Sequence, residues 1–131
     1  MPKDSKISLW LQYASDDLRV ATHALKLASS CPYWLIAYHA QQSAEKYIKA
    51  YLVSKNIDFP YTHDIKTLLD LCGDDFSLPI NNAKILTPYA VITRYPGHNE
   101  PVTKAEALHA IDIAKHVQSY IVEHLKPVTG K

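Results

Sequence analysis

Two residues with complementary chemistry lie close together in the stretch "TRYPGHNEP" at positions 93–101. Arg94 can stabilise negative charge on phosphoryl oxygens, and His98 can transfer protons near neutral pH, because the unperturbed pKa of imidazole is about 6.5. Pro96 and Gly97 favour a turn that directs His98 back toward Arg94. The pair suits chemistry at a phosphodiester. The structural alternative is that Arg94 locks a helix end or pairs with a carboxylate such as Asp17.

A second group of polar side chains lies on one predicted helix. Spacings of three and four residues place His39, Gln42, Lys46 and Lys49 on neighbouring parts of one face. Asp17, on the preceding helix, borders an apolar stripe. Imidazole, amide and ammonium groups suit phosphates and bases, so one interpretation is the wall of a cleft for a nucleotide or RNA. The other is an ordinary solvated face with Asp17 at its edge, because the polar side of an amphipathic helix needs no further cause.

The last predicted helix contains a pair of residues with metal-ligand spacing. Asp112 and His116 are four residues apart, and His109 precedes Asp112 by three. These side chains do not complete a tetrahedral site, and the sequence places no further ligand nearby. We therefore expect an exposed polar face, with no metal site and no cofactor.

The composition limits the remaining function classes. The 131 residues fit one domain, 1–131, and a formal net charge of +1 supplies no general attraction for nucleic acid. No phosphate loop, dinucleotide fingerprint, zinc ribbon or nucleophile elbow occurs in the sequence. A signal-peptide pattern is also missing, as is an apolar run of the roughly 20 residues that cross a bilayer. We expect a cytoplasmic protein with no membrane association, in which Cys31 and Cys72 are small buried residues.

Apolar residues recur at spacings of three and four along most of the chain, which predicts an all-α fold. A long helix is expected over 5–29. A second long helix has Pro32 in its first turn and ends within 54–60. Gln41 falls within the apolar stripe of this second helix. It is expected to face another polar group, because a bare buried amide costs about 1 to 3 kcal/mol.

Capping signals mark two further helices. A short third helix is expected between an N-cap within 62–64 and a stop at Gly73. In "TKAE", Thr103 and Glu106 form a capping box, in which each side chain satisfies a free backbone donor near the other residue. A long apolar stripe follows the box, so this is where the last helix begins.

The segment between these two helices depends on a proline. Either Pro88 kinks a single helix, or Thr87 caps a separate turn that Pro88 opens and that runs to Arg94; we favour the separate turn. With the other elements, this predicts an up-and-down bundle of four to five helices.

Several of these segments together resemble one known family. They are "DDLRVATHAL", "AYHAQQSAEKYIKAYLV", "THDIKTLL", "TRYP" and "AEALHAIDIAKHVQSYIVEHL", which occur in this order over nearly the whole chain. They resemble the HEPN family, the higher eukaryote and prokaryote nucleotide-binding domain. "HAQQSAEKYIKA" followed by "THDIKTLL" is the most specific part of the resemblance.

The resemblance implies a helical bundle that forms homodimers through its long helices, with a cleft at the interface. It implies a nucleotide or RNA ligand and a partner of the minimal nucleotidyltransferase class, in a system of the toxin–antitoxin type. Alternatively, it implies a metal-independent, toxin-like ribonuclease using Arg94 and His98, or a non-catalytic interaction module. Three residues separate Arg94 from His98, one fewer than the family's shortest nuclease spacing.

Overall fold

The computed structural model describes residues 3–27, 29–73, 78–90 and 102–129. Along these residues the chain forms α1 (Lys3–Ala24), α2 (Tyr33–Ser54), α3 (Ile65–Cys72), the 3-10 helix η1 (Leu78–Ala90) and α4 (Lys104–Thr129). The described residues contain no strand. The predicted all-α fold is therefore confirmed.

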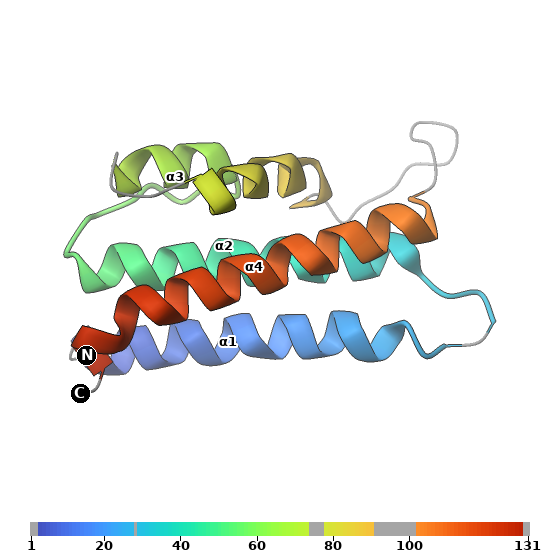
Figure 1. Ribbon diagram of the computed structural model, residues 1–131, viewed down its shortest axis with the longest axis horizontal. Coiled ribbons are helices and arrows are strands. Elements are labelled where there is room, and N and C mark those ends of the chain that lie inside the picture. Colours follow the sequence, from blue (N-terminus) through green and yellow to red (C-terminus); the bar gives the residue numbers. More distant parts are fainter. Residues whose placement is uncertain (1–2, 28, 74–77, 91–101, 130–131) are drawn as a thin grey trace.

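The helices form an up-and-down bundle in which α2 is central (Figure 1). α1 and α2 are antiparallel neighbours, α3 runs in the same general direction as α2, η1 runs back along α3, and α4 again runs in the direction of α2. α2 packs most extensively, against α1 and α4, and it also contacts α3 and η1, whereas α1 and α4 contact each other little. Most of the circumference of α2 is therefore covered by other parts of the chain.

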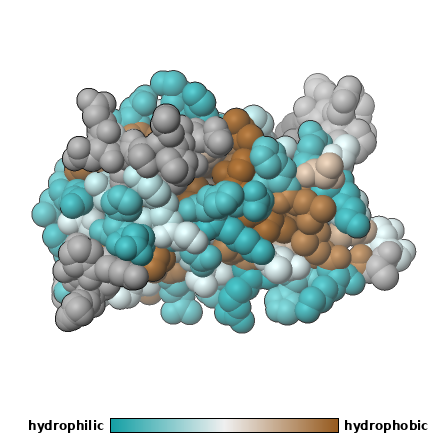
Figure 2. All heavy atoms as spheres, viewed as in Figure 1, coloured by the Kyte–Doolittle hydropathy of each residue, from teal (hydrophilic) through white to brown (hydrophobic). Residues whose placement is uncertain are grey.

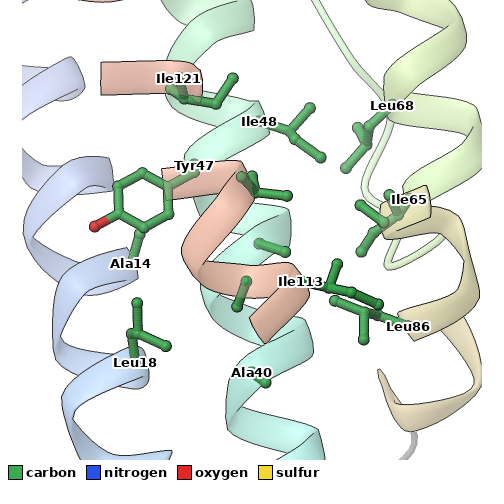
Figure 3. Close-up of a cluster of buried hydrophobic side chains, with 14 of the residues drawn as sticks. Ala14, Leu18, Ala40, Tyr47, Ile48, Ile65, Leu68, Leu86, Ile113 and Ile121 are labelled. Atoms are coloured by element: carbon green, nitrogen blue, oxygen red, sulfur yellow. The ribbon is translucent and has the colours of Figure 1, made fainter. Parts of the chain in front are cut away.

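The core lies around α2 and joins all the elements (Figure 3). The ring of Tyr47 projects from α2 toward Ala14 of α1, while Ile48 points toward Leu68 of α3. All four side chains are almost completely buried, as is Leu86 of η1. Burying each large apolar side chain stabilises the fold by roughly 1.5 to 3 kcal/mol, so this cluster fixes the position of α2.

The predicted caps of two helices are confirmed. The Asp64 side chain accepts a hydrogen bond from the backbone N of Lys66 at 3.1 Å, which satisfies a free donor at the start of α3. Gly73 ends α3 with a φ of 85°, a conformation that favours glycine. At the start of α4, the Thr103 and Glu106 side chains each accept a hydrogen bond from the other's backbone N, at 3.0 and 2.8 Å.

The first helix ends earlier than predicted. α1 stops at Ala24, whereas the apolar periodicity predicts a helix to Ser29. The backbone N–H groups of residues 25–27 donate to carbonyls three residues back, at 3.0 to 3.3 Å, so the last turn tightens and the α-helical pattern is lost. The apolar periodicity of the sequence continues past the end of α1 because the tightened turns still contain apolar residues.

The segment around Pro88 also differs from the favoured prediction. η1 runs from Leu78 to Ala90 with Pro88 inside it, so no separate turn begins at Thr87. The Thr87 hydroxyl instead accepts a hydrogen bond from the backbone N of Ile65 at 3.1 Å. Thr87 therefore ties η1 to the start of α3 and does not cap a new element.

Hydrophobic side chains gather in parts of the face shown in Figure 2, toward the right between α1 and α4, while much of the rest is hydrophilic. Other exposed apolar side chains lie along α1 and are described below. Among the described helices, none has the length and apolar character that crossing a membrane requires.

Candidate functional site

Three polar side chains of α1 and α2 meet between the two helices, and we call them the α1–α2 polar cluster: Asp17, His39 and Lys46. Oδ1 of Asp17 lies 2.9 Å from Nδ1 of His39, and Oδ2 accepts a hydrogen bond from Nζ of Lys46 at 2.5 Å. The His39 and Lys46 side chains are each 24% exposed and that of Asp17 is 14% exposed. The cluster is thus held internally and still reaches the surface.

The charge state of Asp17 follows from its surroundings. Burial alone would raise the pKa of this carboxyl, but hydrogen bonds from His39 and Lys46 and the charge of Lys46 outweigh burial and lower it. Asp17 is therefore ionised at neutral pH. In neutral His39 the proton is assigned to Nδ1, which faces this carboxylate, and Nε2 is then an acceptor.

An apolar strip borders the cluster, and we call it the α1 stripe: Leu9, Tyr13 and Val20 of α1, with Leu27 in the turn just past the end of the helix. These side chains are 37, 50, 48 and 54% exposed. Asp17 lies four residues after Tyr13 and three before Val20, so helical geometry places it on the same side of α1. Exposed apolar side chains that gather on one side of a helix beside polar groups are typical of an interaction site.

A second set of polar side chains surrounds a deeper carboxylate, and we call it the buried polar network: Gln41, Gln42, Glu45, Lys49 and His63. All of these are buried except His63, whose side chain is 45% exposed. Glu45 is its centre and is only 2% exposed. Its carboxylate accepts hydrogen bonds from Nε2 of Gln41 at 3.0 Å and Nζ of Lys49 at 2.8 Å. Nδ1 of His63 lies 2.9 Å from Oε1 of Glu45. The side-chain oxygen of Gln41 in turn accepts a hydrogen bond from Nε2 of Gln42 at 2.7 Å. The predicted polar partner of Gln41 is thereby confirmed.

The Lys49 ammonium is also held by two aromatic rings. It lies 5.5 Å from the ring centroid of Trp10 and 5.6 Å from that of Phe59. The rings pack edge to face, with centroids 6.3 Å apart. Cation–π attraction and the ion pair with Glu45 together compensate a charge that would otherwise be costly to bury.

Two of the predicted ligand-binding residues belong to this network and not to the surface. Gln42 is 7% exposed and Lys49 is 5% exposed. The solvated-face interpretation is wrong for both, because the face that looks polar on an isolated helix is covered in the bundle. A ligand would have to displace internal partners to reach either side chain. The residues that could still contact a ligand are therefore Asp17, His39 and Lys46.

The polar residues of α4 are exposed, as predicted. Nδ1 of His116 lies 3.8 Å from Oδ2 of Asp112, and the two side chains are 66 and 65% exposed. His109 on the same helix is also exposed. Within the part of the chain that the structure describes, no three His, Cys, Asp or Glu side chains gather as metal ligands.

The other predicted pair, Arg94 and His98, lies outside the described residues. The alternative partner proposed for Arg94, the Asp17 carboxylate, is bonded to His39 and Lys46.

His63 is a member of the buried polar network that no spacing in the sequence indicates. His63 is 18 residues from Glu45 and enters the network through the connection between α2 and α3. Helical spacing links Gln41, Glu45 and Lys49, which follow one another at intervals of four, but spacing cannot predict a contact made by a residue outside the helix.

Comparison with known proteins agrees with this architecture. The chain is similar to TT1696 from Thermus thermophilus, with 28% identity, a TM-score of 0.76, and coverage of 90% of this chain and 97% of the other. It is also similar to ST0689, an archaeal HEPN homologue, with 26% identity, a TM-score of 0.74, and coverage of 92 and 98%. No match was found among curated proteins.

The family itself is given by a direct sequence match. The HEPN domain model matches residues 7–125, which include α2, α3 and η1 and most of α1 and α4. The same range includes the α1–α2 polar cluster and the buried polar network. The chain belongs to the HEPN domain family.

Proposed function

We propose that the protein is a HEPN-fold homodimer that binds a nucleotide or RNA at the α1–α2 polar cluster. The observation that carries the proposal is the cluster itself, in which one partly buried carboxylate holds a lysine and a histidine at a partly exposed position between two long helices. The resemblance of the sequence to a nucleotide-binding family supports the same class of ligand.

The chemistry of the cluster suits a phosphate next to a sugar or base. The Lys46 ammonium has three donors and gives one to Asp17, so others can bind phosphate oxygens. Nε2 of His39 can accept from a ribose hydroxyl, or donate to phosphate once the ring is protonated. The Tyr38 ring lies edge to face with His39, at a centroid distance of 5.2 Å, and adds an aromatic surface for a base.

The α1 stripe supports the dimer part of the proposal. Leu9 precedes Tyr13 by four residues and Val20 follows Tyr13 by seven, which is the spacing of an apolar seam between packed helices, and Leu27 lies in the turn just past the end of α1. A two-fold interface uses the same surface on both subunits. Because Asp17 lies on the stripe side of α1, such an interface would bring two polar clusters to one cleft.

RNA binding can be tested with a short fluorescein-labelled single-stranded RNA followed by fluorescence anisotropy, and with ATP by calorimetry. Lys46→Gln removes a charged donor and is expected to weaken binding about 3- to 10-fold and to reduce the salt dependence. His39→Gln is expected to have a smaller effect, since an amide can replace the hydrogen bond to Asp17.

Lys115→Gln is the matched control, because Lys115 is an exposed lysine on α4, a helix that contributes no residue to the cluster. Its RNA affinity should fall only by the small, general effect of one lost charge. The proposal fails if Lys46→Gln and Lys115→Gln bind RNA equally well, or if the wild-type protein binds neither RNA nor ATP.

The dimer can be tested by light scattering after size-exclusion chromatography. Val20→Glu places a charge in the α1 stripe and is expected to give monomers. Val122→Glu is its control, because Val122 of α4 is 42% exposed and Val20 is 48% exposed. A monomeric wild-type protein, or dimers of both variants, would rule out this interface.

A minimal nucleotidyltransferase is the protein partner we propose, on the basis of family resemblance. Co-expression of this chain with a nucleotidyltransferase encoded beside it should yield a complex that copurifies. Separate elution of the two proteins at micromolar concentration would argue against the pairing.

Ribonuclease activity stays a prediction from Arg94 and His98. It requires RNA cleavage in EDTA that Arg94→Ala abolishes. RNA that stays intact with excess protein would exclude the activity and would leave the binding proposal unaffected.

A further inference from the structure

At one end of the bundle α1 begins and α2 ends (Figure 1). Side chains from these two parts of the chain line a hollow. Its volume is about 640 Å³, within the range of small-molecule sites. The start of α1 and the segment after α2 form most of its wall. We call it the aromatic hollow, and its lining residues are Lys3, Lys6, Trp10, Val53, Asn56, Ile57, Asp58 and Phe59.

The aromatic part of the wall is fixed from inside the protein. Trp10 and Phe59 both line the hollow, and both rings contact the buried Lys49 ammonium. Lys49 is held in turn by Glu45 at 2.8 Å. The two rings are thus positioned before any ligand arrives, which lowers the entropic cost of binding.

The charged part of the wall is exposed to solvent. Lys3 and Lys6 of α1 are both exposed, and Nζ of Lys3 donates to the backbone O of Ser54 at 3.2 Å. Lys6 makes no ion pair with any residue that the structure describes, which leaves its ammonium available. Asp58, the acidic residue of the lining, reduces the positive charge of the two lysines without cancelling it.

We propose that the aromatic hollow binds a small aromatic anion, meaning a planar ring that carries one phosphate or carboxylate group. The ring would pack against Trp10 and Phe59, and the charged group would pair mainly with Lys6 and secondarily with Lys3. A neutral ring would lose the ion pair, and a bare anion would lose the aromatic contact. The site shares no residue with the α1–α2 polar cluster and does not depend on the function proposed there.

Trp10 provides the signal for a test, once the other tryptophan has been replaced. In a Trp34→Phe background, phenyl phosphate and phenylacetate are expected to change the fluorescence of Trp10 saturably. Benzyl alcohol supplies the ring alone and inorganic phosphate the charge alone, and both should bind at least about tenfold more weakly. The two aromatic anions show which charged group is preferred.

Lys6→Gln should weaken binding of the preferred anion about 3- to 10-fold, and Lys115→Gln in the same background should leave it unchanged. Calorimetry with the Trp34→Phe protein gives a second measurement that does not depend on fluorescence. If neither aromatic anion binds by either method at millimolar concentration, or if Lys6→Gln and Lys115→Gln bind equally, the proposal is wrong.

Discussion

Helix α2 supplies polar side chains to two regions that differ in their surroundings. His39 and Lys46 join Asp17 in the α1–α2 polar cluster, where their side chains are 24% exposed. Glu45 and Lys49 join the buried polar network, where their side chains are 2 and 6% exposed. Each region is built around one carboxylate with a lysine and a histidine beside it.

The difference shows that residue type does not decide what a polar group does in this fold. Asp17 has two side-chain partners and reaches solvent, so water or a ligand can replace a lost contact. Glu45 has three and is itself only 2% exposed, although the His63 side chain that contacts it is 45% exposed. We therefore expect substitutions in the network to change stability, and substitutions in the cluster to change binding.

The largest effect should come from Glu45→Ala. This change leaves the buried Lys49 ammonium without its carboxylate and removes an acceptor from Gln41 and His63. The free energy of unfolding should fall by about 3 to 5 kcal/mol, measured by urea denaturation followed by circular dichroism. A loss below about 1 kcal/mol would mean that water already enters the network, and the contrast between the regions would disappear.

Asp17→Asn should have a smaller effect on stability and a different effect on binding. The Lys46 and His39 side chains can be hydrated after the change, so the free energy of unfolding should fall by only about 1 kcal/mol. RNA affinity should stay the same or rise, because a negative charge beside the phosphate is removed. A loss of affinity as large as that of Lys46→Gln would show that Asp17 is needed to position the lysine.

The pH dependence of stability should distinguish wild type from Asp17→Asn further. The pKa of Asp17 is lowered in the folded state. Its contribution to the free energy of unfolding is therefore complete above the pKa of the unfolded state, about 4, and is lost as the pH falls through the pKa of the folded state. The difference in unfolding free energy between the two proteins should be constant from neutral pH down to about pH 5 and then shrink. A difference that instead grows below about pH 4 would contradict a lowered pKa.

The smallest effect should come from an exposed pair with the same spacing as Lys49 and Glu45. Lys66 and Asp70 are also four residues apart, with Nζ to Oδ2 at 3.1 Å, and both side chains are 66% exposed. Asp70→Ala should change the free energy of unfolding by less than about 0.5 kcal/mol in the denaturation used for Glu45→Ala. A larger loss would mean that spacing matters more than burial.

Local signals in the sequence were sufficient for several parts of the fold. The Asp64 cap, the stop at Gly73 and the box of Thr103 and Glu106 each depend on residues within one helical turn, and all three are confirmed. Apolar periodicity likewise predicted the long helices, because a helix that packs on one side repeats its buried positions every three to four residues.

Apart from the early end of α1, the predictions that were wrong concern interactions between distant segments. The side of α2 that carries Gln42 and Lys49 looks like a solvated face, because periodicity cannot show that Trp10 and Phe59 will cover Lys49. The segment at Thr87 similarly depends on a hydrogen bond to Ile65, 22 residues away. Periodicity did place His39 and Lys46 together, although their common partner, Asp17, comes from another helix.

The position of His63 in the buried polar network bears on the order in which the protein folds. Gln41 and Lys49 are both four residues from Glu45, so two of the three side chains bound to its carboxylate come from α2 itself. Only the contact with His63 must wait for the connection to α3 to close over the helix. α2 can therefore enter a collapsing core with most of its buried charge already compensated. Substitutions at His63 should speed unfolding more than they slow folding.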